Sequence, residues 1–232
     1  MEKIDFLNLI EGHYGLQLTK PQLQYFFAEN KYVAMTCPRR GGKSFITYMD
    51  SLYPCTTPNT KVAIVLPYEH GVKIAKDEII NMANALNEYM HILSSLSNCI
   101  QFSNGSKIYL FNAKNFEAGV CGCRLNQVTI EEPDQMVNME SIKHIAEACM
   151  CPNENAQFKI IGTHGISRHN LAAYMLSPYF KSITATLNNT HVRYTREQLH
   201  ALESALPQEV YSLEILNHMT PSILNSTLSN NE

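Results

Sequence analysis

The chain has 232 residues, 45% of them hydrophobic and 17% charged, and 18 basic against 21 acidic side chains leave a net charge of −3. This composition excludes a disordered or collagen-like chain, and the length allows one or two domains of about 150 residues. No global positive field is present, so any nucleic-acid contact has to come from a local patch. The longest apolar runs, such as Val62–Pro67, are far shorter than the ~20 residues that cross a bilayer. Seven cysteines and an N-terminus without a secretory pattern lead us to expect reduced thiols in a cytoplasm.

The first part of the sequence alternates between helix and strand patterns. Residues 1–29 are expected to be helical, and a short run of β-formers at Tyr32–Thr36 is followed by a Cys-Pro pair and two glycines. A helix is expected over Ser44–Leu52. Lys61–Leu66 is almost wholly apolar, which is typical of a strand buried on both faces of a parallel sheet. Apolar residues at helical spacing predict a further helix over residues 70–95.

Short strands predominate in the middle of the chain. Cys99–Phe102 and Lys107–Phe111 flank a Ser-Asn-Gly-Ser segment, which predicts a β-hairpin. Two more short strands, Val128–Ile130 and Phe158–Ile161, enclose a helix expected over Ser141–Cys149. Strands that alternate with helices predict an α/β fold with a mainly parallel central sheet flanked by helices. Ligands of such sheets bind at the carboxyl ends of the strands.

The segment that follows the first strand has the pattern of a phosphate-binding loop. Residues 37–44 match G-x-x-x-x-G-K-[ST] at every defined position except the first, where Cys37 replaces glycine. The chemistry needs a tight turn whose backbone N–H groups converge on phosphate oxygens at the start of a helix. It also needs a lysine for the β- and γ-phosphates and a hydroxyl for Mg²⁺. These parts are supplied by Gly41, Gly42, Lys43 and Ser44.

Two adjacent arginines add to this interpretation. Arg39 and Arg40 place two cations in one short loop, where they repel each other unless an anion is present. The alternative for the arginines is a solvated basic turn, and for the whole motif a surface loop with an incidental lysine.

Paired acids follow the strand Val128–Ile130. Hydrolysis of ATP needs one carboxylate to hold Mg²⁺ and another to orient and deprotonate the attacking water. Glu131 and Glu132 are adjacent at a strand end, so their side chains point in different directions and can divide these roles. Thr163 ends the next strand, where its hydroxyl either senses the γ-phosphate or caps a turn.

In this order, the motifs resemble the ATPase domain of the large terminase subunit, a P-loop NTPase of the ASCE type that packages DNA into tailed-phage and herpesvirus capsids. Leu18–Gln22 is similar to the family's adenine-reading glutamine motif, and its spacing favours Gln22 over Gln24. Arg39 stands where the family has an arginine in its variant loop. The resemblance extends to Phe102–Ile108, which is similar to the family's hairpin before the acidic strand, and to Thr195–Glu214, which is similar to the segment that joins ATPase to nuclease.

The resemblance implies an Mg²⁺-dependent ATPase that translocates double-stranded DNA, with ATP and Mg²⁺ as cofactors. It implies that Glu132, Arg39 and Thr163 are catalytic, the last as part of a coupling motif with Gly162. The implied nucleotide-binding residues are Gln22, Arg39, Arg40, Gly41, Gly42, Lys43 and Ser44, and the implied metal ligands are Ser44 and Glu131.

The resemblance also implies partners and a location. The partners are double-stranded DNA, further copies of the chain in a ring on a capsid portal, and a small terminase subunit, with no membrane. The location is the cytoplasm of the host cell, or the nucleus of a eukaryotic host. We expect an ATPase domain over residues 1–190 and a helical linker over 191–232, without a nuclease domain.

Three departures from the family pattern leave alternatives open. Glu131 replaces the usual Asp, and Cys121-Gly122 stands where many members have Arg-Gly, so that Arg124 is the nearest candidate for an arginine finger. The chain ends at Glu232, where a full-length terminase would begin its nuclease. The alternatives are another P-loop ATPase of helicase type, and a nucleotide-binding assembly module without turnover.

The cysteines allow a second interpretation. Cys121 and Cys123, with Cys149 and Cys151, form two C-x-C pairs that resemble a four-thiolate zinc site. Structural zinc sites generally use C-x₂₋₄-C pairs, so the spacing favours buried apolar thiols over zinc.

Overall fold

The computed structural model describes residues 1–232 except 88, 97, 166–167, 193 and 220–232. The chain divides into two compact units. The first unit comprises Met1–Leu18, Ser44–Glu131 and Asn138–Lys159, and the second comprises Thr19–Lys43, Glu132–Val137 and Ile160–Glu232.

Eight strands form the sheet. They are β1 (Tyr32–Thr36), β2 (Lys61–Leu66), β3 (Ile92–Leu96), β4 (Cys99–Phe102), β5 (Lys107–Asn112), β6 (Gln127–Glu131), β7 (Gln157–Gly162) and β8 (Lys181–Thr184). Their order is β3-β4-β5-β2-β6-β7-β1-β8. Strand β2 pairs in parallel with β5 and β6, and β1 pairs in parallel with β8, whereas β4 is antiparallel to β3 and β5. The predicted α/β fold with a mainly parallel sheet is confirmed.

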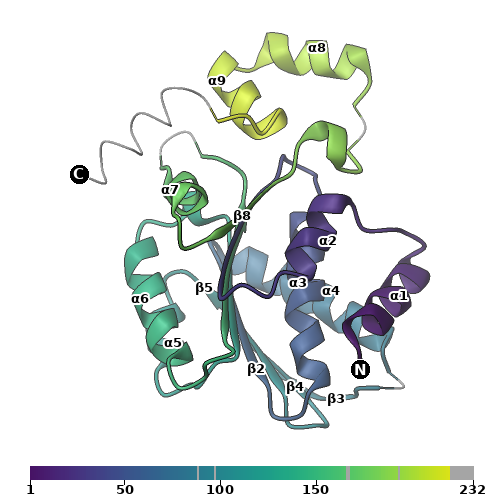
Figure 1. The fold of residues 1–232 in the computed structure, drawn as a ribbon, viewed down its shortest axis with the longest axis vertical. Helices are drawn as coiled ribbons and strands as arrows, with labels where there is room; N and C mark the ends of the chain where they lie inside the picture. The colour runs from purple at the N-terminus through teal and green to yellow at the C-terminus, as the bar shows by residue number, and fades with distance from the viewer. Residues whose placement is uncertain (88, 97, 166–167, 193, 220–232) are drawn as a thin grey trace. The chain divides into compact units, whose positions relative to one another are not determined.

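In the first unit, helices cover both faces of the strands. Figure 1 shows α1 (Lys3–Tyr14), α3 (Lys43–Leu52) and α4 (Glu69–Asn84) on one face, and α5 (Phe116–Val120) and α6 (Met139–Met150) on the other. Residues 62–66 of β2 are all buried, as the apolar run predicts for a central parallel strand.

The predicted hairpin is formed by β4 and β5. The Asn104 amide donates to the Cys55 carbonyl at 2.8 Å, and its Oδ1 accepts from the Ser106 N–H at 3.0 Å. This Asn side chain therefore fixes the turn through one local bond, as Asn does in many turns, and ties it to the segment around Cys55 through the other.

In the second unit, α2 (Lys20–Phe26) and α7 (Asn170–Leu176) lie on opposite faces of the β1–β8 pair (Figure 1). The rest of this unit contains α8 (Arg196–Ala205), α9 (Gln208–Val210) and a π-helical turn over Tyr211–Ile215. Part of the predicted helical linker, residues 193 and 220–232, lies outside the described residues.

Two sequence predictions were too coarse. Residues 1–29 are two helices, because Gly15 at φ 61° ends α1 and Thr19 begins α2, with its backbone N–H bonded to the Gln22 side chain. The helix predicted over residues 70–95 ends at Asn84, and Ile92–Leu96 instead forms strand β3 beside β4. A partner strand supplies backbone hydrogen bonds here, and helical periodicity does not report this.

A charged pair lies inside the first unit. Lys159 Nζ on β7 donates to Asp50 Oδ1 on α3 at 2.8 Å, and the two side chains are 0% and 2% exposed. Gln127 Nε2 on β6 donates to the other Asp50 oxygen at 2.9 Å. These bonds fix α3 against the two strands.

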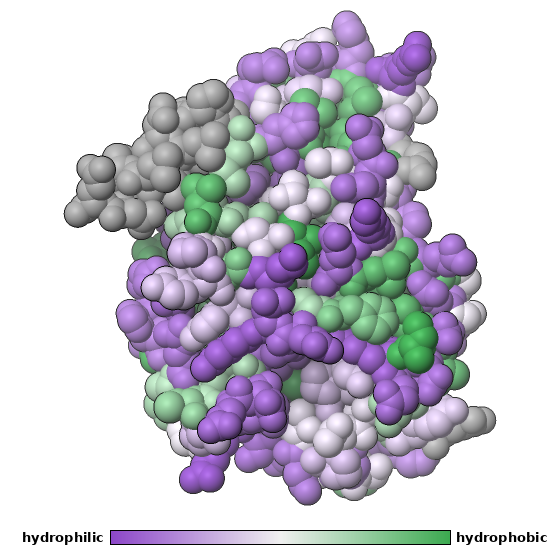
Figure 2. Space-filling model, in the orientation of Figure 1, coloured by the Kyte–Doolittle hydropathy of each residue, from purple (hydrophilic) through white to green (hydrophobic). Residues whose placement is uncertain are grey.

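Hydrophilic residues predominate on the face shown in Figure 2, and the hydrophobic ones occur there in separate groups. Within the described ranges, no helix combines the length and the apolar character needed to cross a membrane.

Candidate functional site

The loop between β1 and α3 folds back on its own lysine. Lys43 is buried, and its Nζ donates to the Pro38 carbonyl at 3.2 Å and to the Cys37 carbonyl at 3.5 Å. The Gly41 N–H donates to the same Pro38 carbonyl at 3.1 Å. Residues 37–43 therefore form a tight turn in which two backbone carbonyls converge on the ammonium group.

Backbone strain is concentrated in two of the predicted site residues. Four non-glycine residues of the described chain have positive φ, and two are asparagines, Asn59 and Asn217, a type that tolerates this conformation. The other two are Arg40 at φ 63° and Glu132 at φ 56°. Such outliers cost about 1–3 kcal/mol each and cluster at functional sites.

Gly42 is required by both conformation and space. Its φ is +81°, and a Cβ at this position would lie 2.5 Å from Gln22 Nε2. Gln22 is buried, accepts from the Thr19 backbone N–H at 2.8 Å and donates to the Gly42 carbonyl at 3.4 Å, whereas Gln24 is exposed. Gln22 is thus the glutamine that packs on the loop, and its contact with adenine remains a prediction.

Glu132, Lys43 and Thr163 form a polar network in the second unit. Lys43 Nζ lies 3.4 Å from Glu132 Oε1. Glu132 Oε2 accepts from the Thr163 backbone N–H at 3.0 Å, and the Thr163 hydroxyl donates to the Cys37 carbonyl at 3.2 Å. Thr163 therefore contacts both the acid and the start of the loop, which suits a residue that transmits a change at one to the other.

Ser44 and Glu131 contact each other in the first unit. The Ser44 hydroxyl donates to Glu131 Oε1, and the neighbouring Tyr48 has a raised pKa because of burial and the Glu131 charge. A hydroxyl and a carboxylate are the hard oxygen donors that Mg²⁺ prefers. The side chain of Glu131, longer than the usual Asp, reaches the hydroxyl directly. The donor set therefore fits the predicted metal.

A role for Asp134 was missed at the level of sequence. Its carboxylate is buried and accepts from the backbone N–H groups of Gly165 at 2.7 Å and Leu171 at 2.8 Å. Burial raises the pKa of Asp134 to about 6, although the two backbone hydrogen bonds act to lower it. Burial, with the charge of His169, lowers the pKa of His164 to about 4. Asp134 thus fixes the segment after Glu132 to the segment after β7, and its only sequence signal is its place two residues beyond the acid pair.

The two loop arginines differ in their surroundings. Arg39 donates from Nε to Glu214 Oε2 at 2.6 Å, and its pKa is raised by this hydrogen bond and by the charges of Glu214 and Glu132. Arg40 is exposed. Arg124, the candidate finger, is exposed in the first unit, and its role remains a prediction.

The cysteines are all free thiols. The expectation of buried thiols was wrong for the two C-x-C pairs, because Cys121 and Cys151 are exposed and Cys123 and Cys149 are only partly buried. Burial raises the pKa of Cys37, in the loop, to about 11, so this thiol is protonated at neutral pH. In the described part of the chain, no group of three or more His, Cys, Asp or Glu side chains is arranged to hold a metal ion.

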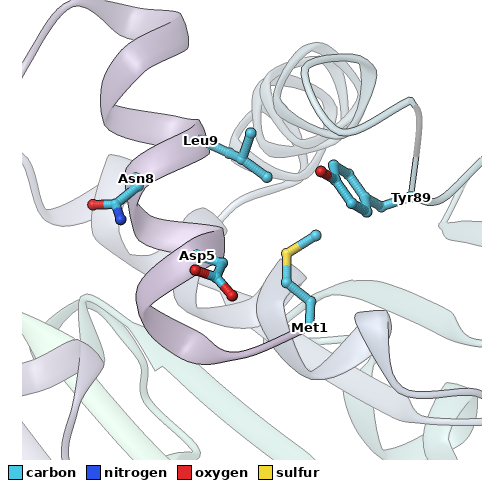
Figure 3. Close-up of a pocket in the computed structure, with 5 residues that line it drawn as sticks. All are labelled: Met1, Asp5, Asn8, Leu9 and Tyr89. Carbon is cyan, nitrogen blue, oxygen red and sulfur yellow. The ribbon is translucent and has the colours of Figure 1, made fainter.

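A separate pocket of about 640 Å³ lies in the first unit (Figure 3). It is lined by Met1, Asp5, Asn8 and Leu9 of the α1 region and by Tyr89. None of the predicted site residues lines it, and its lining has no arginine or lysine that would attract a phosphate.

Three solved structures show the same fold. The ATPase domain of the Thermus phage P74-26 large terminase aligns with a TM-score of 0.71 at 14% identity, over 91% of this chain and 96% of that one. The chain has the fold of a large terminase ATPase domain. The large terminases of a thermophilic bacteriophage and of bacteriophage HK97 align with TM-scores of 0.67 and 0.63 at 13% and 14% identity, over 85% and 99% of this chain. The chain spans about half the length of these two proteins, 52% of each.

No family model matches the sequence, and no curated protein is similar to it in sequence. The likeness to terminases thus lies in the fold.

Proposed function

We propose that the protein is an Mg²⁺-dependent ATPase of the terminase motor type, which hydrolyses ATP to translocate double-stranded DNA into a viral capsid. The observation that carries this proposal is the network of Lys43, Glu132 and Thr163. It joins a phosphate-loop lysine, an acid after a strand and a hydroxyl at the next strand end. The large terminase of the thermophilic bacteriophage, which shares the fold, has been solved with ADP and with ATP-γ-S.

In this proposal the residues of the second unit handle the phosphates and the water. Lys43 and Arg39 neutralise phosphate charge, and the strained turn at Arg40 and Gly42 directs backbone N–H groups at the oxygens. Glu132 orients the attacking water and accepts its proton, which gives ADP and inorganic phosphate. Thr163 transmits loss of the γ-phosphate to the loop through its bond to the Cys37 carbonyl.

The metal ligands adjoin these residues in the chain. Ser44 directly follows Lys43, and Glu131 directly precedes Glu132. Mg²⁺ held by these two side chains would supply charge neutralisation at the β- and γ-phosphates.

The proposed partners follow from the motor function. They are double-stranded DNA and further copies of the chain in a ring on a capsid portal, together with a small terminase subunit, in the host cytoplasm. With a net charge of −3, the DNA contact must be a local positive patch. We expect weak hydrolysis by isolated monomers.

The test is steady-state ATP hydrolysis with Mg²⁺, with and without double-stranded DNA. Wild type is compared with Lys43→Ala, which removes the phosphate contact, and Glu132→Gln, which removes the base but keeps the size. We expect both variants to lose turnover, Glu132→Gln by roughly 10²–10⁴-fold with nucleotide binding retained. DNA should stimulate the wild type. Turnover unchanged in Glu132→Gln would contradict the assignment of the base.

A further inference from the structure

We propose that Glu214 is an internal competitor for the nucleotide: its carboxylate holds the Arg39 guanidinium that the phosphates take over when they bind. The inference rests on the proposed nucleotide site and adds to it a residue of the C-terminal segment. Glu214 lies in the π-helical turn Tyr211–Ile215, far in sequence from the phosphate loop.

Two contacts join Arg39 to Glu214. The Arg39 backbone N–H donates to the Glu214 carbonyl at 2.9 Å, and the Arg39 Nε donates to the Glu214 carboxylate at 2.6 Å. A phosphate bound in the loop would draw on the same backbone donors and the same cation. The segment around Glu214 thus engages the two groups of Arg39 that a phosphate would use.

The turn that carries Glu214 is held in place by contacts of its neighbouring residues that do not involve Arg39. Leu213 is fully buried and packs against Ala172 of α7. Asn217 is buried, accepts from the Thr36 hydroxyl at 2.7 Å and donates to the Ala185 carbonyl at 2.6 Å. These contacts fix the turn on the end of β1. Removal of the Glu214 charge should therefore free the guanidinium and leave the turn in position.

The side-chain pair is weak enough to exchange. The Arg39 and Glu214 side chains are 59% and 22% exposed, and a solvated pair of this kind is worth about 0–1 kcal/mol. A nucleotide phosphate carries more negative charge and accepts bidentate bonds from a guanidinium, so it outcompetes a single carboxylate. By linkage, nucleotide binding then loosens the contact between the loop and the C-terminal turn, and the turn in return lowers nucleotide affinity.

The experiment measures equilibrium binding of Mg·ATP-γ-S and Mg·ADP to wild type and to Glu214→Gln at low salt. We expect the variant to bind both nucleotides roughly three- to tenfold more tightly, and the gain to shrink at high salt because screening weakens the competitor. Glu203→Gln removes the same charge from an exposed position on α8 and should bind like wild type.

A double-mutant cycle with Arg39→Ala separates competition from a structural effect. In the Arg39→Ala background, Glu214→Gln should change affinity by less than about twofold, because the contested guanidinium is gone. Equal or weaker binding by Glu214→Gln, or an undiminished gain without Arg39, would overturn the inference and leave the proposed function standing. Absence of nucleotide binding by wild type would overturn both.

Discussion

Two ion pairs of this protein have similar lengths and opposite surroundings. Lys159 and Asp50 are joined at 2.8 Å inside the first unit, with both side chains at most 2% exposed. Arg39 and Glu214 are joined at 2.6 Å in the second unit, with the arginine side chain 59% exposed. The difference shows that the two pairs have different costs of separation, because the exposed Arg39 can change partners without leaving a buried charge behind, whereas Lys159 cannot.

The buried pair has a structural role. Asp50 accepts from both Lys159 and Gln127, so α3 is bonded to two strands at once. The exposed pair joins Arg39 of the predicted phosphate loop to Glu214 of the C-terminal turn, and a ligand in the loop can replace the carboxylate. Substitutions in the first pair should therefore change stability, and substitutions in the second should change nucleotide affinity.

The largest expected effect is the loss of the buried carboxylate. Asp50→Asn leaves the Lys159 ammonium buried without its counter-charge, and we expect about 3–5 kcal/mol of destabilisation in urea unfolding. The double variant Asp50→Asn/Lys159→Met removes both charges and should recover part of this loss. If the free energy of unfolding of Asp50→Asn lies within about 1 kcal/mol of the wild-type value, the buried pair does not have the structural role given to it here.

The next effect is the pH dependence that His164 contributes. Its folded pKa of about 4 lies below the ordinary value of 6.5, so between these values only the unfolded state binds the proton. The contribution of His164 to the free energy of unfolding is therefore complete above pH 6.5 and is lost as the pH drops toward 4, a loss of up to about 3 kcal/mol. His164→Gln should lose this pH dependence of stability, whereas His200→Gln, at an exposed position on α8, should keep it. Identical pH profiles for wild type and His164→Gln would refute the assignment.

Asp134 contributes with the opposite sign over much of the same range. The pKa of Asp134 is about 6 in the folded protein, above the ordinary 3.8, so the folded state binds the proton more tightly than the unfolded state. The stabilisation from this group is therefore complete below pH 3.8 and is lost as the pH rises through 6. The two groups therefore partly cancel in wild type. His164→Gln should show stability that increases, relative to wild type, as the pH falls from 6 to 4.

A smaller effect is expected from the loop glycine. Gly42→Ala places a side chain at φ +81° against Gln22, and we expect about 1–2 kcal/mol of destabilisation together with weaker nucleotide binding. Gly12→Ala is the matched control, because an added Cβ in α1 meets nothing within 4 Å. That control should be neutral or stabilising by up to about 1 kcal/mol in thermal unfolding. Equal effects of the two substitutions would contradict the requirement for glycine in the loop.

The smallest effect is expected for the stability of the exposed pair. Glu214→Gln should shift the free energy of unfolding by less than about 1 kcal/mol, since solvated pairs contribute little. A small loss of stability in Glu214→Gln beside a large loss in Asp50→Asn would distinguish an exchangeable ion pair from a structural one. A loss of several kcal/mol in Glu214→Gln would place both pairs in the same structural class.

The sequence predicted the central strands well because their signals are local. The apolar run Lys61–Leu66 and the Asn-Gly turn of the hairpin each correspond to an observed element. Strands β3 and β8 were misassigned or missed because they are short, largely exposed edge strands, formed by pairing with a neighbour. Pairing of this kind leaves no periodic signal in the chain.

The candidate site was predictable where its residues form motifs. The loop residues and the acid pair have fixed spacings, and the structure brings Lys43, Glu132 and Thr163 together. Asp134 lies in no motif, and the segment Thr195–Glu214 did not predict the contact of Glu214 with Arg39, since both roles come from contacts with segments far away in sequence. Lys159 was missed because a lysine within a strand usually faces solvent.

The most direct test of the central claim is calorimetric binding of Mg·ATP-γ-S to wild type and to Lys43→Ala. We predict one nucleotide bound per wild-type chain and an affinity at least about tenfold weaker for Lys43→Ala, which loses the ammonium group proposed to bind the phosphates. No binding by wild type, or equal binding by both proteins, would contradict a nucleotide site built on residues 37–44.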